Sequence, residues 1–266
     1  MGIDLFFKNT NTFGTPALGD SLFLQLGNTA IINNPDQSGL AAGGLDVVNV
    51  AREWFGNIGT DTAPFQAEIN KDAGSVFNYD AGGGECFYFP DSAAGADECL
   101  KLRVTGEGVM HVINGGQITE LVALTSLTTI ELAVVVPTLR VGWNGEVRLE
   151  NEGAATRPTL VEIGGNGVLK SQRGVDGIVD QWGGLAVWDV LTDAFVTYNL
   201  MGGECDLGES GNFVTFNWRK GKFNPRRLSR EITITNLNIW EKDINPQDLA
   251  DVLGHPLLDI TNTNFV

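Results

Sequence analysis

The chain has 266 residues, a formal net charge of −16, 19% charged residues, 42% hydrophobic residues and 34 glycines. Plentiful hydrophobic residues exclude a disordered chain, and the negative charge argues against nucleic acid and anionic membranes as general partners. Glycine tolerates the backbone conformations that tight turns require, so this composition favours many short strands joined by turns. It predicts a compact all-β protein.

Residues 1–98 are expected to form a β-rich region distinct from the repeats that follow. Asp4–Lys8 and Ser21–Leu26 look like strands, and the second alternates hydrophobic and polar residues. Ser75–Tyr79 and Glu85–Phe89 are short aromatic strands, whereas Leu45–Phe55 is the best helix candidate despite its valines. Such a region suits a docking module or a cap that closes one end of the repeats.

A glycine-rich motif recurs between residue 99 and residue 223. Val141–Val147 (Val-Gly-Trp-Asn-Gly-Glu-Val) is echoed by Ile163–Val168 and again, at twice the first interval, by Leu207–Phe213. Val104–Val109 is an earlier relative. Each copy has the pattern of a strand end, a turn and a strand start, so a period in the low twenties predicts a parallel β-helix or β-solenoid. An antiparallel β-sandwich is the alternative fold.

The repeat makes a geometric prediction about two columns of stacked residues. The interior column is expected to contain Val141, Ile163 and Leu207. The turn column is expected to contain Gly142, Gly164 and Gly208.

Residues 224–266 change character and are expected to form a strand, a short helix and a tail. Glu231–Trp240 alternates as a long strand does. Asn245 as N-cap, Pro246 at the first position and Gly254 at the end predict the helix. The tail, Asp259–Val266, reads as an extended segment available to pair with a neighbouring chain.

Signals for an enzyme are few, and we expect no enzymatic activity, no cofactor and no metal. The only two histidines, His111 and His255, lie in no nucleophile motif. Cys86, Cys99 and Cys205 lack metal-site spacing; a Cys86–Cys99 bridge is one option, and buried free thiols are favoured. The sequence also shows no signal-peptide pattern at its start and no transmembrane stretch.

A group of carboxylates keeps one enzymatic alternative open. Parallel β-helices can carry paired carboxylates that cleave glycosidic bonds. Four aspartates lie close together in the sequence, beside two tryptophans that could stack on a sugar: Asp176, Asp180, Asp189 and Asp193, with Trp182 and Trp188. The other interpretation is that these acids are solvated turn residues.

A basic cluster is the most unusual local feature of so acidic a chain. Six of the 17 basic residues follow one another closely: Arg219, Lys220, Lys222, Arg226, Arg227 and Arg230. Such a patch would steer docking onto an acidic protein surface. A solvated turn is the alternative.

With Val141–Val147 and its echoes as the most specific element, the chain resembles bacteriophage capsid decoration (cement) proteins of β-solenoid character. The resemblance implies a homotrimer that binds the major capsid protein on the capsid exterior of the virion, after assembly in the host cytoplasm. It implies no cofactor, no nucleic acid and no membrane. Because no diagnostic motif matches, no functional residue is transferred. Phage tailspikes share the solenoid, so a carbohydrate-cleaving enzyme or adhesin is the alternative.

The contacts with the capsid are expected at the chain ends and at the basic cluster. Met1–Phe13 and Asn262–Val266 are the predicted contact arms. The individual residues predicted to touch the partner are Phe6, Phe7, Phe265 and the six cations of the basic cluster.

Overall fold

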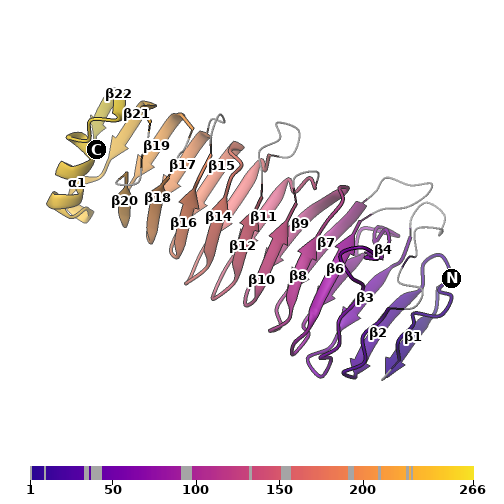
Figure 1. Ribbon diagram of the computed structural model, residues 1–266. Helices are drawn as coiled ribbons and strands as arrows, with labels where there is room; N and C mark the ends of the chain where they lie inside the picture. Colours follow the sequence, from indigo (N-terminus) through magenta and orange to yellow (C-terminus); the bar gives the residue numbers. More distant parts are fainter. Residues whose placement is uncertain are drawn as a thin grey trace. The chain divides into compact units, whose positions relative to one another are not determined.

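Figure 1 draws the computed structural model of the chain. It describes residues 2–8, 10–32, 36, 44–90, 98–131, 134–150, 157–190, 195–208, 211–225, 228 and 230–266. The chain divides into two compact units, Met1–Val136 and Pro137–Val266. Each unit is built from parallel strands that alternate between two sheets, so the expected all-β solenoid is confirmed.

In the first unit, one sheet orders its strands as β1 (Asp4–Lys8), β2 (Ser21–Leu26), β3 (Val47–Val50), β5 (Val76–Tyr79), β7 (Glu98–Val104) and β9 (Gln117–Ala123). The other sheet orders them as β4 (Phe65–Gln66), β6 (Glu85–Phe89), β8 (Val109–Val112) and β10 (Leu127–Ile130). Neighbours in each sheet pair in parallel. The same coil construction therefore runs through the region before residue 98 and continues beyond it.

The second unit repeats this arrangement. Its first sheet contains β11 (Thr138–Val141), β13 (Leu160–Ile163), β15 (Val175–Gln181), β17 (Phe195–Leu200), β19 (Phe213–Trp218), β21 (Ile232–Ile239) and β22 (Leu258–Phe265). Its second sheet contains β12 (Glu146–Leu149), β14 (Val168–Ser171), β16 (Leu185–Trp188), β18 (Glu204–Leu207) and β20 (Lys222–Asn224). Between β21 and β22 lie the 3₁₀ helix η2 (Glu241–Asp243) and the helix α1 (Pro246–Leu253).

The caps of α1 agree with the sequence prediction. The Asn245 side chain accepts a hydrogen bond from the Gln247 N–H at 2.9 Å, and Pro246 occupies the first turn. Gly254 follows the last helical residue. The helix therefore begins and ends where its capping residues predict.

The helix expected at Leu45–Phe55 is wrong, because Val47–Val50 forms strand β3. Val48 and Val50 are buried, whereas Val47 and Asn49 alternate with them on the other face. β-Branched side chains restrict rotamers in a helix and pack well on a sheet, which explains the outcome.

The predicted columns are confirmed for one pair of repeats. Val141 pairs in register with Ile163, its counterpart in the next copy of the motif, and both are buried. The Gly164 N–H donates to the Val141 carbonyl at 2.9 Å, so Gly142 and Gly164 occupy equivalent corner positions.

The prediction is wrong for the third member of each column, Leu207 and Gly208. Leu207 ends β18 in the other sheet, where it pairs with Trp188, and Gly208 lies at that sheet's corner. The residue that continues the column beyond Ile163 is Gln181, which follows after a shorter coil. The next coils after Ile163 are shorter than the one before it. A motif copy placed at twice the Gly142-to-Gly164 interval therefore falls on the opposite side of the coil.

Glycines at the Val141 corner let successive turns approach closely. Gly184 has φ +69°, and a Cβ built on it would lie 2.1 Å from the Gly167 carbonyl oxygen. A Cβ on Gly164, one coil earlier, would meet nothing within 4 Å. The corner therefore requires glycine at position 184 but has room for a side chain at position 164.

Replacing Gly184 by alanine is expected to destabilise the protein by about 3 kcal/mol, because left-handed backbone and a backbone clash both penalise a Cβ. Gly164→Ala is the matched control and should change stability by less than about 0.5 kcal/mol. Urea unfolding followed by circular dichroism measures both. Equal effects of the two substitutions would contradict this account of the corner.

Aromatic side chains fill the interior of the second unit. Tyr198 stacks on Phe216 with ring centroids 5.0 Å apart, and Phe216 stacks on Phe223 at 4.4 Å. Phe195 stacks on Phe213 at 4.6 Å. In-register pairing of β17 with β19 brings Phe195 over Phe213 and Tyr198 over Phe216, while Phe223 meets Phe216 from the other sheet.

The outer face of the same sheet carries a ladder of amides, hereafter the asparagine ladder. Each side-chain amide donates to the residue one coil before it: Asn199 to Asp180, Asn217 to Asn199 and Asn238 to Asn217, all at 2.7 Å, and Asn264 to Asn238 at 2.9 Å. The ladder ties the coils together from β15 to β22.

Candidate interaction surfaces

Strand β22 is the last strand of its sheet and leaves one backbone edge without a neighbouring strand among the described residues. Residues 261–266 are all exposed, and Phe265 and Val266 keep 55% and 70% of their surface accessible. The Val266 N–H donates to the Ile239 carbonyl at 2.8 Å. Alternate N–H groups point in opposite directions, so those of Thr263 and Phe265 face the open edge.

This edge lacks the features that usually block pairing with another strand. Natural edge strands are short, or carry lysine, proline or a bulge. β22 has eight residues, contains neither lysine nor proline, and its only charged residue is Asp259. The asparagine ladder also ends on it, at Asn264. The predicted extended tail is therefore a full strand with a pairing-competent edge.

Strand β1 provides an edge at the other end of the chain. Phe6 is 58% exposed and stacks on Phe23 with centroids 5.1 Å apart, while Phe7 packs edge-to-face on Phe13 at 5.7 Å. Ile3 is 60% exposed. Of the two predicted contact residues here, Phe6 lies outward and Phe7 is partly covered by the first unit's own core.

The described residues of the basic cluster make different local contacts. Lys222 bonds Glu204 at 2.8 Å on the second sheet, and the Arg230 guanidinium donates to the Val190 carbonyl at 2.9 Å. Arg219 lies over the Trp240 ring, 4.6 Å from its centroid, and Lys220 beside it is exposed. Arg226 and Arg227 lie outside the described residues.

Arg219 and Trp240 belong to a corner that leads to the last strand. Trp240 donates its backbone N–H to the Trp218 carbonyl at 3.0 Å. Because Ile239 pairs with Phe265, the position of Trp240 is taken in the next coil by Val266. A cation over an indole face gives this corner both positive charge and aromatic surface. It adjoins the exposed Phe265, so the carboxyl end gathers Arg219, Trp240 and β22 into one surface.

The described aspartates Asp176, Asp180 and Asp189 lie at different places in the second unit. Asp176 forms an ion pair with Arg157 at 3.2 Å, and Asp180 accepts the first bond of the asparagine ladder. Asp189 follows β16 at the other corner, and Asp193 lies outside the described residues. Of the two tryptophans, Trp188 is fully buried and only Trp182 is exposed.

Both histidines make local contacts within the fold. His111 Nδ1 lies 2.7 Å from the Thr129 hydroxyl, and its ring stacks on Phe87 with centroids 4.6 Å apart. His255 Nδ1 accepts from the Leu257 N–H at 3.3 Å. Among the described residues, no group of three or more His, Cys, Asp or Glu side chains is placed to hold a metal ion.

All three cysteines are free and buried, as the sequence favoured. Burial raises the pKa of the Cys99 and Cys205 thiols to about 12 and raises the pKa of Cys86 further. Thiols held protonated in this way are poor nucleophiles and poor metal ligands.

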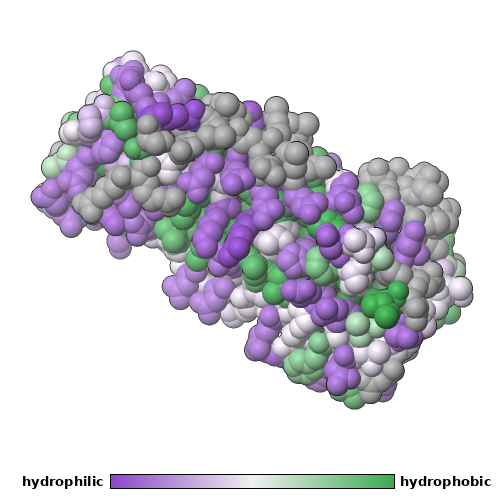
Figure 2. Space-filling view, viewed as in Figure 1, coloured by the Kyte–Doolittle hydropathy of each residue, from purple (hydrophilic) through white to green (hydrophobic). Residues whose placement is uncertain are grey.

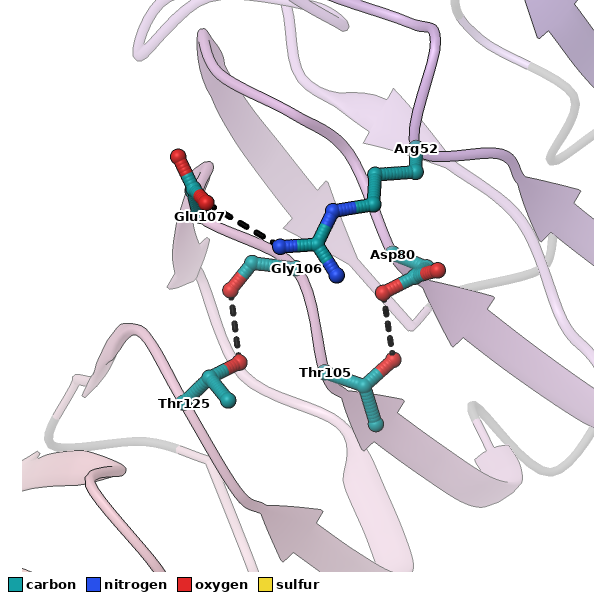
Figure 3. A network of polar contacts seen from close by, with 6 residues as sticks. All are labelled: Arg52, Asp80, Thr105, Gly106, Glu107 and Thr125. Carbon is teal, nitrogen blue, oxygen red and sulfur yellow. Dashed lines mark hydrogen bonds and ion pairs between the residues drawn. The ribbon is translucent and has the colours of Figure 1, made fainter.

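A polar network occupies the corner that follows β3, β5, β7 and β9 in the first unit (Figure 3). Three side-chain bonds join its coils: Arg52 to Glu107 at 3.0 Å, Thr105 to Asp80 at 3.0 Å and Thr125 to the Gly106 carbonyl at 2.6 Å. Arg52 and Glu107 are well exposed, so their ion pair contributes little stability. The two threonine hydrogen bonds link successive coils at this corner.

The face of the molecule in Figure 2 is mostly hydrophilic, with hydrophobic residues scattered in small groups among the described residues. Within that described part, no helix is both long and apolar enough to cross a membrane.

Sequence reasoning missed the asparagine ladder, the Arg219–Trp240 contact and the exposed Trp143. A signal for the ladder existed, because Asn199, Asn217, Asn238 and Asn264 each precede a large apolar residue near a strand end. No family model matches the chain, and neither a curated protein nor a solved structure matches it.

Proposed function

We propose that this chain is a virion structural protein, a capsid decoration protein that binds across major capsid subunits and stabilises the shell. One observation carries the proposal: β22 presents an eight-residue strand edge with exposed Phe265 and Val266 and no blocking residue. An edge of this kind accepts a strand from another chain, and backbone hydrogen bonds then supply much of the affinity.

The rest of the chain supports a mechanical role. Stacked aromatic pairs inside the second unit and the asparagine ladder on its outer face join neighbouring coils. A repeat array of this type is a rigid scaffold, because each coil contacts its neighbours over its whole length. The exposed Phe6 and Ile3 at β1 give the first unit its own contact surface.

Stabilisation follows from mass action. A protein that binds the assembled lattice and not the free subunits shifts the equilibrium toward the shell by RT ln(1 + [L]/Kd), about 2.7 kcal/mol at a hundredfold excess over Kd. The proposed state in solution is a homotrimer, which places three such strand edges on one particle.

We expect Thr263→Pro to abolish binding to assembled shells of the major capsid protein encoded with this chain, because proline removes an N–H that faces the open edge. Co-sedimentation with those shells measures binding, and the temperature of shell disassembly measures stabilisation. Thr263→Val is the matched control, since it keeps the N–H and should bind normally.

Two results would overturn the proposal. One is a wild-type chain that neither co-sediments with the shells nor raises their disassembly temperature. The other is undiminished binding by two separate variants, Thr263→Pro and a chain that lacks Asn262–Val266. Circular dichroism of each variant separates lost binding from lost folding.

A further inference from the structure

Two tryptophans project from one corner of the second unit. Val141, Ile163 and Gln181 pair in register on β11, β13 and β15. The Trp182 N–H donates to the Ile163 carbonyl at 2.8 Å, as the Gly164 N–H does to the Val141 carbonyl, so Trp182 lies on the same corner as Gly142, two coils later. Trp143 is the residue that follows Gly142 at this corner. Adjacent strands lie about 4.8 Å apart, so the two tryptophans stand roughly 9.6 Å apart along the stack.

Both indole rings are open to solvent. Trp143 keeps 70% of its surface exposed and Trp182 keeps 51%. Between them the chain places Gly164 and Gly165, which have no side chains. A Cβ on Gly165 would lie 3.0 Å from the Trp143 backbone nitrogen, so the glycines form a low floor directly beside the first tryptophan.

Trp143 occupies a backbone conformation that does not favour it. Its φ is +51°, in the left-handed region where bulky residues are rare. The equivalent position one coil later is Gly165, with φ +57°. A tryptophan with a strained backbone and a mostly exposed ring gains little from burial, and such strain is typical of binding positions.

The surroundings of the rings indicate the chemistry of the occupant. Asn144 and Asn166 follow the two turns, and their amides are joined by a hydrogen bond of 3.4 Å. On the outer face next to the corner, Arg140 is paired with Glu162, and Asp180 lies in register beside Glu162, so this face carries no net positive charge. Two separate rings with amides and a backbone floor suit a ligand that has apolar faces and a hydroxyl rim.

We propose that Trp143 and Trp182 form a binding platform for a neutral oligosaccharide, with one sugar ring stacked on each indole and the intervening sugar ring over the Gly164–Gly165 floor. The roughly 9.6 Å spacing is on the order of a disaccharide repeat. The net charge of −16 disfavours anionic glycans, which commits the occupant to an uncharged one. This site is separate from the strand edges proposed for capsid attachment.

Isothermal titration of the full chain with cellohexaose, maltohexaose and chitohexaose tests the platform, with a hexamer of galacturonic acid as the anionic comparison. At least one neutral hexamer is expected to bind with a Kd of about 1 mM or below. Trp143→Ala and Trp182→Ala should each weaken that binding at least about tenfold. Phe55→Ala, an exposed aromatic residue at a corner of the first unit, should leave it unchanged.

Trp143→Gly separates function from folding. Glycine relieves the left-handed strain, so this variant should unfold at the same temperature as the wild type or higher, and yet lose the sugar. The platform is overturned if no neutral hexamer binds, if the acidic hexamer binds as well, or if Trp143→Gly with Trp182→Ala binds normally. It is also overturned if those substitutions abolish a dimer of this chain, since the occupant would then be a second copy.

Discussion

Raising the pH above about 10 is expected to unfold the protein cooperatively, and the first unit should unfold before the second. All three tyrosines and all three cysteines of the chain are buried: Tyr79, Tyr88, Tyr198, Cys86, Cys99 and Cys205. Burial is the largest cause that raises the pKa of every one of them.

The direction of the pH effect follows from proton linkage. An unfolded thiol or phenol ionises near about pH 8.5 or 10, whereas the buried group keeps its proton. The unfolded state therefore binds fewer protons at alkaline pH, and stability present at about pH 8 is lost as pH rises toward the folded-state pKa, about 12 for Cys99 and Cys205.

The two units differ in the number of such groups. The first unit, Met1–Val136, contains four of them and should lose up to about 5 kcal/mol per pH unit above pH 10; the second contains two and should lose about 3 kcal/mol per pH unit. With domain stabilities of about 5–15 kcal/mol, unfolding is expected near about pH 11.

Tyrosinate absorbance, circular dichroism and hydrogen exchange of each unit provide the measurements. Absorbance of tyrosinate should appear together with the loss of circular dichroism, because the phenols ionise only on unfolding. Gradual ionisation near about pH 10 with the β signal intact would contradict the account. Cys86→Ala with Cys99→Ala should flatten the slope of the first unit between about pH 8.5 and 10.

The coil construction could be predicted from the sequence where the local signal and the repeat agree. Val141–Val147 and Ile163–Val168 are one coil apart, and their glycines mark the corner correctly. The distinction between helix and strand failed at Leu45–Phe55, because acidic and aromatic residues around the valines resemble an amphipathic helix. Tertiary pairing of Val48 with Leu22 and Phe77 decides for a strand.

The length of each coil could not be predicted from the Val141–Val147 motif alone, because coils of different lengths end in similar glycine turns. Phe195–Leu200 and Phe213–Trp218 are near-identical hexapeptides in successive coils, and they pair in register. That repeat, rather than the echo at Leu207–Phe213, gives the period of this part of the chain. Glycine spacing shows where the chain turns, whereas the similarity of the strand sequences shows which turns are stacked on one another.

The candidate surfaces were only partly accessible to sequence reasoning. Phe6 and Phe265 lie outward as a contact role requires, but clustering along the chain did not predict that Lys222 and Arg230 bond Glu204 and Val190 on separate elements. Exposure is a property of the packed coil, so the solvent-facing Trp143 and the buried Trp188 could not be told apart by residue type.

Replacing Tyr198 by phenylalanine is expected to destabilise the second unit by roughly 2–6 kcal/mol. The Tyr198 hydroxyl donates to Gln181 Oε1 at 2.6 Å and accepts from Trp188 Nε1 at 3.2 Å, and all three side chains are fully buried. Removing the hydroxyl leaves two buried polar groups without that partner, at about 1–3 kcal/mol each.

A double-mutant cycle isolates the polar contribution. Gln181 is held in place by its amide, which donates to the Glu204 carbonyl at 2.9 Å, so Gln181→Leu also costs stability. With Gln181→Leu and Tyr198→Phe combined, the loss should be smaller than the sum, because one of the stranded groups is gone. Strict additivity in urea unfolding would mean that the hydrogen bond contributes nothing.

The same substitution links this network to the alkaline transition. Tyr198→Phe removes one of the two ionisable groups that make the second unit sensitive to high pH, so its slope should fall by about 1.4 kcal/mol per pH unit. Phe216→Leu is the control, since Phe216 stacks on Tyr198 at 5.0 Å without ionising. Phe216→Leu should lower the free energy of unfolding by the same amount at every pH. The slope of that free energy against pH should stay unchanged, because the lost packing involves no change in bound protons.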